Sequence, residues 1–416
     1  MPELTGRGRR IDRLRTAVRR IADSYREPLG SPGALAFFVA AAPGRVGIAM
    51  TSLGIVWLVH WRTGSFGAAG VVTGGFAIAE ACMGPQVARL VDRFGQTRVL
   101  PPCLVAHGVA VVALVAAAAA GAPLSLLTPL GILVGAFIPQ TGALTTSRWA
   151  WLLDGSPALS SAFALESVSN GVAYVVGPAL VGAIGTFAHP VATTLVAGGL
   201  VVGAGFALAL QPATAPPPTR LSAAATGRRA TLLHRPFAVI VGANLGLGLF
   251  FGSTQVAVTA FAIERGQPAA AGVVLGVSSL ASLLAGALYG LRRWRTAAQK
   301  QIRVTLLLIT TGGVLLPAAG TVQFLVVALA VAGLGIAPTL ILLTLLTEAR
   351  VEREELTQAF TWQNSASAAG IALGAAAAGH LADTLGNRWA FAGAVGAMAL
   401  ATGAVWSPDT SSERGT

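Results

Sequence analysis

Residues 84–99 read GPQVARLVDRFGQTRV, a stretch rich in arginine between two long apolar runs at 67–88 and 99–120. Each run has the length, about 20 mostly apolar residues, that carries a helix across a bilayer. The same alternation of an apolar run and a short polar break continues in both directions along the chain. It predicts twelve membrane-spanning helices, at 34–59, 67–88, 99–120, 124–147, 158–184, 187–211, 236–262, 268–290, 304–320, 322–346, 357–381 and 388–406.

Composition supports this interpretation. Only 11% of the 416 residues are charged and 54% are hydrophobic, with a mean hydropathy of +0.71. Soluble proteins carry roughly 25% charged residues, so a soluble enzyme, a secreted disulfide scaffold and a disordered chain are all disfavoured. We therefore expect an all-α polytopic membrane protein with twelve transmembrane helices in two pseudo-symmetric six-helix bundles. The five histidines and two cysteines have no metal-ligand spacing, and no cofactor is expected.

The basic residues gather in every second break. Formal net charge is +12, and 24 of the 28 basic residues fall in the N-terminal arm, alternate loops, the central linker and the tail, with Arg148 assigned to one of these loops. Because lysine and arginine stay on the cytoplasmic side, we expect both termini in the cytoplasm. The excess charge then marks membrane topology and not a nucleic-acid surface. A single lysine among so many arginines favours a bacterial origin, and hence the bacterial cytoplasmic membrane.

The breaks also divide the chain into segments. A stretch rich in proline and arginine interrupts the apolar pattern between the sixth and seventh spans and predicts a cytoplasmic linker. Within the arm, residues 9–26 favour an amphipathic helix on the anionic inner leaflet, or else a disordered basic arm that only enforces topology. The expected segments are the arm at 1–32, an N-terminal six-helix bundle at 33–211, the linker at 212–235, a C-terminal six-helix bundle at 236–407 and a tail at 408–416.

The loop quoted first carries the sharpest motif. Gly84, Asp92, Arg93, Gly95 and Arg98 resemble the signature of the major facilitator superfamily, with extra residues between the glycine and the aspartate. In that family the loop forms a charge latch that stabilises one access state, and the resemblance implies the same here. The second half has only a degenerate copy at 290–293, which lacks the aspartate.

Span five carries a second resemblance. Gly171, Gly177, Pro178 and Gly182 resemble the glycine-rich motif of the family's drug antiporters, where it packs the two halves together. The alternative is generic close packing of helices through small residues. The intramembrane arginine motif that the family's best-known drug antiporters have in span four is not matched at 138–142.

Three charged residues are expected deep within spans: Arg45, Glu80 and Glu166. A charge at the bilayer centre costs about 2.5–3.5 kcal/mol on insertion scales, so it usually has a partner or a function. Arg45 follows Pro43-Gly44, which we expect to loosen the first helix. Arg45 either switches between the two carboxylates and couples proton entry to substrate exit, or forms a static buried pair with one of them.

Other polar side chains either line a cavity or join helices by hydrogen bonds. They are Gln140 and Thr141 in span four, Asn244 and Gln255 in span seven, and Gln363 and Asn364 in span eleven. Trp149, near the end of span four, is expected in the interfacial belt of aromatic residues.

These features predict a secondary active transporter. The chain lacks the Gly-Lys-Ser/Thr of a phosphate-binding loop, so ATP is not expected as a partner, and no catalytic constellation points to an enzyme. Our leading hypothesis is proton-coupled export of small hydrophobic or amphiphilic compounds by a monomer. The expected partners are a small-molecule substrate, protons and the lipid bilayer. The alternatives are a metabolite or sugar-type importer on the same fold, and a non-transporting membrane receptor or scaffold.

Overall fold

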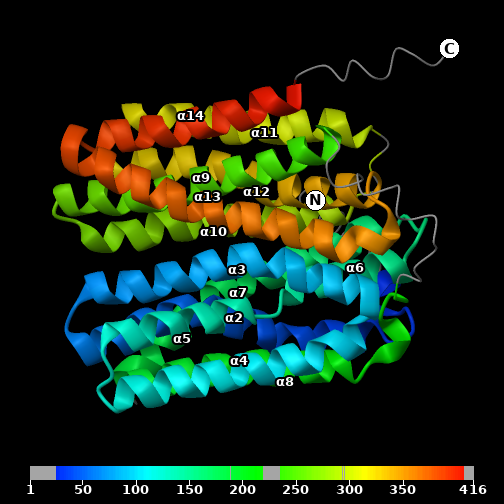
Figure 1. Cartoon of the computed structure of the whole chain (residues 1–416). Helices are drawn as coiled ribbons and strands as arrows, with labels where there is room; N and C mark the ends of the chain where they lie inside the picture. The colour runs from blue at the N-terminus through cyan, green and yellow to red at the C-terminus, as the bar shows by residue number, and fades with distance from the viewer. Residues whose placement is uncertain (1–24, 188, 219–234, 293, 295, 407–416) are drawn as a thin grey trace, which may run out of the picture.

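The computed structural model describes residues 25–187, 189–218, 235–292, 294 and 296–406, and in this part of the chain every regular element is a helix (Figure 1). The first half contains α2 (Ala34–Thr63), α3 (Phe66–Phe94), α4 (Gln96–Ala119), α5 (Leu124–Ala136), α6 (Thr141–Leu152), α7 (Leu159–Phe187), α8 (Pro190–Ala209) and the short η1 (Pro212–Thr214). The second contains α9 (Arg235–Glu264), α10 (Pro268–Gly290), α11 (Ala298–Leu315), η4 (Leu316–Ala318), α12 (Val322–Glu348), η5 (Arg353–Glu355), α13 (Leu356–Leu385) and α14 (Asn387–Trp406).

Within the described residues, eleven spans are long and apolar enough to cross a membrane, with α5 and α6 together forming one of them. The helix α14 packs beside α9, α11 and α13 at the place of a twelfth. The expected all-helical polytopic fold is therefore confirmed. The predicted amphipathic helix at 9–26, most of the linker and the tail at 408–416 lie outside the described residues, apart from 25–26 and 212–218.

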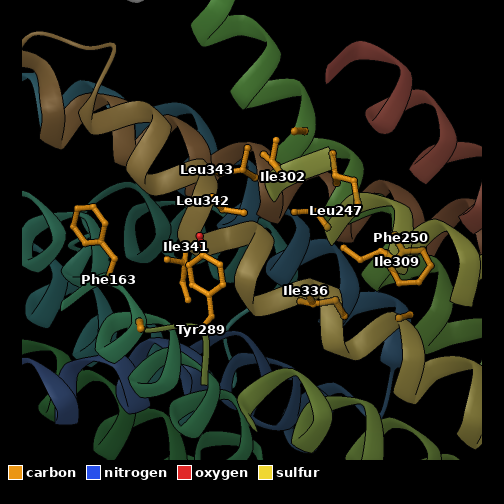
Figure 2. Packing of buried hydrophobic residues seen from close by; sticks show 14 of the residues in the cluster. Phe163, Leu247, Phe250, Tyr289, Ile302, Ile309, Ile336, Ile341, Leu342 and Leu343 are labelled. Carbon is orange, nitrogen blue, oxygen red and sulfur yellow. The ribbon is translucent and has the colours of Figure 1, made fainter. Parts of the chain in front are cut away.

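The helices form two bundles that lie side by side (Figure 1). We call the end that holds the α3–α4, α6–α7, α10–α11 and α12–α13 connections the arginine-rich end, because Arg98, Arg292 and Arg353 lie there; it is on the right in Figure 1. At this end α3 gives way to α4 at Gly95, whose φ of +90° is a conformation that favours glycine. One cluster of buried apolar residues runs through both bundles, from Phe163 on α7 to Phe250 on α9 (Figure 2).

Span four is broken, and span one is not. Residues 137–140 separate α5 from α6 without helical structure, and Pro139 within this break has no N–H to continue a helix. His107 on α4 supports the break, since its Nδ1 lies 3.0 Å from the Val134 carbonyl oxygen and donates to it. The expectation that Pro43 loosens the first helix is wrong, because α2 continues through it and Gly44 lies tightly against α8.

Arg148 is buried instead of lying in a loop. It is 0% exposed on α6 and donates to the carbonyls of Leu208 and Gln211, at 2.8 and 3.0 Å, and to the Thr214 hydroxyl at 2.7 Å. The carbonyls at the end of α8 carry the negative end of the helix dipole, and the Leu208 carbonyl also accepts from the Gln211 N–H at 3.1 Å. They accept hydrogen bonds from the cation, while the Gln96 side chain accepts from its Nε at 2.7 Å.

Glycines set the closest helix pair, α9 and α13. A Cβ atom added to Gly248 or Gly252 would overlap the backbone of α13, and one added to Gly370 or Gly374 would overlap the backbone of α9. On each helix the two glycines are four residues apart, so they lie on one face. Small residues at this spacing let membrane helices approach closely, which strengthens van der Waals packing.

This interface makes a stability prediction. Gly374→Val should lower the melting temperature of the purified protein, because the added side chain must displace the α9 backbone at a cost of about 1–3 kcal/mol or more. Gly379→Val, on the same helix, is the matched control, since nothing lies within 4 Å of its Cβ position. Equal melting temperatures for the two variants would contradict the interface.

Candidate functional site

A buried ion pair lies inside the first bundle. Nη2 of Arg45 on α2 pairs with Oε2 of Glu166 on α7, and the two residues are 4% and 5% exposed, respectively. Arg45 also donates to Ser169 Oγ at 2.7 Å and to Thr145 Oγ1 at 2.5 Å, and its guanidinium lies over the Phe38 ring. Of the two carboxylates that the sequence offered to Arg45, the structure joins it to Glu166.

The carboxylate of Glu166 has several donors. Trp149 Nε1 donates to Oε1 at 2.7 Å, and Thr145 Oγ1 lies 2.9 Å from Oε2. Trp149 is 0% exposed, so its expected place in an interfacial belt is wrong. Thr141, Thr145 and Trp149 are spaced by four residues along α6, which places them on one face toward the pair. That spacing is the signal by which the sequence could have found Trp149 and Thr145.

Two polar atoms beside the pair have no partner within the described residues. They are Nε of Arg45 and the hydroxyl of Thr141. The Thr141 hydroxyl lies 3.5 Å from the Cβ position of Gly44, the residue before Arg45. Buried polar groups without partners are costly, so this part of the site has unused hydrogen-bonding capacity.

Glu80 lies apart from the pair. It is half-buried on α3 and accepts a hydrogen bond of 3.0 Å from Nε2 of Gln140 in the span-four break. One turn further along α3, the Cβ position of Gly84 lies 3.6 Å from Cγ of Gln140 and 3.4 Å from Cγ2 of Thr361 on α13. Glu80 is thus near the contact between the two bundles.

Asp92 of the family-like loop reaches across the bundles. Its Oδ2 accepts from the backbone N–H of Gln358, in the first turn of α13, at 2.9 Å. The first N–H groups of a helix lack internal partners and carry a partial positive charge, so a carboxylate there caps the helix. Arg93 and Arg98 are exposed, and the Arg93 guanidinium lies over the Phe94 ring.

Further contacts close the arginine-rich end. Ser161 of α7 donates to the Gly290 carbonyl of α10 at 2.7 Å, and an exposed ion pair joins Asp154 to Arg353. Hydrogen bonding from Arg353 lowers the pKa of Asp154, so this ion pair persists above the lowered pKa and is lost as the pH falls through it. Tyr25 donates to the Ala287 carbonyl at 2.6 Å, and burial raises its pKa to about 12.

The Asp92 and Ser161 contacts join α3 to α13 and α7 to α10. Toward the end of the molecule opposite the arginine-rich end, some positions on these four helices are open. Glycines located there have no atom within 4 Å of their Cβ positions; they are Gly74, Gly182, Gly276 and Gly379. The polar contacts between the bundles described above lie at the arginine-rich end.

The glycine motif of span five is divided between two roles. A Cβ atom added to Gly171 would lie 3.3 Å from Leu283 of α10, in the other bundle, whereas one added to Gly177 would meet Ala49 of α2 within the first bundle. Pro178 is exposed, and Gly182 faces open space. The motif as a whole therefore does not form the junction of the two halves.

The predicted polar residues of the second bundle fall into two groups. Asn244 and Gln363 are buried and hydrogen-bonded to each other at 3.3 Å, and Gln363 also donates to Thr347 at 2.6 Å. They join α9, α13 and α12, which differs from an arrangement that lines a cavity. Gln255 and Asn364 are exposed.

Two helical bundles that meet at one end, with buried charges inside one of them, define a membrane transporter of the repeat-built type. A sequence model of the Major Facilitator Superfamily matches residues 34–320 and 267–416. The chain therefore belongs to the Major Facilitator Superfamily and is a secondary transporter, not an enzyme. No curated protein sequence matches it significantly.

Solved structures share the fold at low sequence identity. A bacterial homologue of the iron transporter ferroportin, in an outward-facing state, superposes with a TM-score of 0.76 at 13% identity, covering 89% of this chain and 98% of that one. The transporter FucP of Escherichia coli, in the outward conformation, gives 0.67 at 13% identity, covering 92% and 98%. The human organic anion transporter MFSD10 gives 0.61 at 17% identity, covering 93% and 99%.

The ion pair can be tested through stability. Arg45→Met should destabilise the protein by about 3–5 kcal/mol, because it leaves the Glu166 carboxylate buried without its cation. The double variant Arg45→Met/Glu166→Leu should recover much of this loss, and Glu264→Gln, at an exposed position, serves as control. Thermal unfolding in detergent measures all three; a single variant as stable as the control would contradict a buried pair.

The Asp92 contact makes a separate prediction. Asp92→Ala should raise the fraction of molecules that are open at the arginine-rich end. The variant removes the cap from the first turn of α13, and loss of such a cap costs about 0.5–2 kcal/mol. Asp92→Asn keeps an acceptor oxygen and should raise this fraction less. Distances between spin labels at positions 98 and 353 report the fraction, and identical distributions in the parent and Asp92→Ala would refute the role.

Proposed function

We propose that this transporter couples the movement of protons to the export of small hydrophobic or amphiphilic compounds. The observation that carries the proposal is the Arg45–Glu166 pair, buried inside the first bundle. A proton taken up by Glu166 cancels its charge and releases Arg45 from its partner in a medium of low dielectric constant. The packing around the pair must then change, which links protonation to the conformation of the bundle.

The hydrogen-bond donors support this coupling. Trp149 and Thr145 both contact Glu166 from α6, and Ser169 contacts Arg45 from α7. A change in the charge of Glu166 therefore acts on two helices that also contact the second bundle. The hydroxyls of Thr145 and Ser169 remain available to Arg45 when it leaves the carboxylate.

Orientation is part of the proposal. We place the arginine-rich end in the cytoplasm of a bacterium, because cytoplasmic loops carry the excess of lysine and arginine. The contacts at that end then correspond to an outward-facing state. Opening to the cytoplasm requires the Asp92–Gln358, Ser161–Gly290 and Asp154–Arg353 contacts to break.

The substrate class follows from the second bundle. Away from the arginine-rich end, the described ionisable residues Glu264, His380 and Arg388 of its helices are all exposed, and none lies buried inside the bundle. An apolar wall favours a compound with a hydrophobic body over a sugar.

The experiment is gradient-driven transport in proteoliposomes loaded with a fluorescent lipophilic dye. An imposed pH gradient should drive dye movement by the parent protein and by Glu264→Gln. Glu166→Gln should exchange dye down its own gradient but no longer respond to the pH gradient, because residue 166 cannot change charge. A full response in Glu166→Gln, or a parent protein indifferent to collapse of the gradient, would refute proton coupling; inward dye movement against its gradient would indicate an importer.

A further inference from the structure

A second polar cluster borders the ion-pair network where three spans from both bundles meet, because Thr145 also contacts the Gly142 carbonyl at 3.1 Å. Its centre is Gly142, the second residue of α6. The Cβ position of Gly142 is 3.9 Å from Nδ2 of Asn170 on α7 and 3.9 Å from Nδ2 of Asn364 on α13. The two amides come from different bundles, so a molecule between them contacts both.

Glu80 belongs to the same region. It is hydrogen-bonded at 3.0 Å to Gln140, which lies two residues before Gly142. Because residues i and i+4 share a helix face, Glu80 is on the face of α3 that carries Gly84. Gly84 contacts Thr361 of α13, one turn before Asn364. The carboxylate therefore faces the boundary between the bundles, one turn from their contact.

These groups have unused binding capacity. Within the described residues, the contact of Glu80 is a neutral amide and no cation pairs with it. The side chains of Asn170 and Asn364 make no hydrogen bond there, and Asn364 is exposed. Tyr174, one turn beyond Asn170 on α7, is 67% exposed.

We propose that this cluster, composed of Glu80, Gln140, Asn170, Tyr174 and Asn364, binds the ammonium group of a hydrophobic primary amine. The inference rests on the proposed function and names its substrate class. The ammonium group donates to the Glu80 carboxylate and, once the amide groups of Asn170 and Asn364 turn their oxygens toward it in place of Nδ2, to these two oxygens as well. Its hydrophobic body extends along the Tyr174 ring toward the open end of the bundles.

The charge balance excludes the other ligand classes. The Glu80 carboxylate would repel an anion, and a neutral compound would leave that charge without an ionic partner. The Arg45–Glu166 pair is not available to the amine, since Glu166 already accepts from Arg45, Thr145 and Trp149. In this proposal Glu166 binds the proton, and Glu80 binds the ammonium group of the substrate.

The test uses three fluorescent probes with one body. Each probe has a dansyl group at one end of a hexyl chain. The other end is an ammonium group in the first probe, its neutral N-acetyl derivative in the second and a carboxylate in the third. Each probe is titrated into the purified full-length protein in detergent. The ammonium probe should bind about tenfold or more tightly than the other two, as expected for a charge-assisted hydrogen bond. Glu80→Gln should abolish the preference, whereas Glu80→Asp and the exposed control Glu264→Gln should keep it.

The amides provide a second arm. Asn364→Leu and Asn170→Leu should each weaken the ammonium probe several-fold and leave the N-acetyl probe nearly unchanged. Equal affinities of the three probes, or an undiminished preference in a Glu80→Gln protein that elutes and melts as the parent does, would overturn the proposal. The titration needs no pH gradient, so loss of the ammonium preference and loss of proton coupling in proteoliposomes are separate results.

Discussion

The buried pair of Arg45 and Glu166 is the interaction on which the rest of the first bundle depends. Two charges taken out of water are tolerated when they are closely paired and most of their other hydrogen-bonding groups have partners, as here, where Nε of Arg45 is left without one within the described residues. Here three helices supply groups to one network. Arg45 comes from α2, Thr145 and Trp149 come from α6, and Glu166 and Ser169 come from α7. The network therefore links the three helices to one another.

Outside this network, close packing of helix backbones and hydrogen bonds to helix ends hold the helices together. In the second bundle, Gly248 and Gly374 let α9 and α13 pack backbone to backbone. Between the bundles, Asp92 accepts from an N–H in the first turn of α13, and in the first bundle Arg148 donates to carbonyls at the end of α8. A firmly packed helix pair beside a junction made of breakable polar contacts suits a protein whose two bundles move against each other as units.

The sequence predicts the fold class because apolar runs of membrane length are visible without any tertiary information. It also singles out Arg45 and Glu166, since charges are rare within such runs. It does not predict the burial of Arg148, whose acceptors at Leu208 and Gln211 lie about 60 residues away and are backbone atoms that carry no sequence signature. The break at 137–140 was missed for a related reason: Pro43 and Pro139 look alike in sequence, and only packing against neighbouring helices decides which proline interrupts a helix.

The proposed coupling requires Glu166 to exchange a proton as the bundles change state. Infrared difference spectroscopy of the purified protein detects this exchange, by comparing the form closed at the arginine-rich end with the form trapped open there. We expect a protonated carboxyl band in the open form that is present in Glu80→Gln and absent in Glu166→Gln. A band that persists in Glu166→Gln, or a Glu166 that stays ionised in both forms, would contradict it.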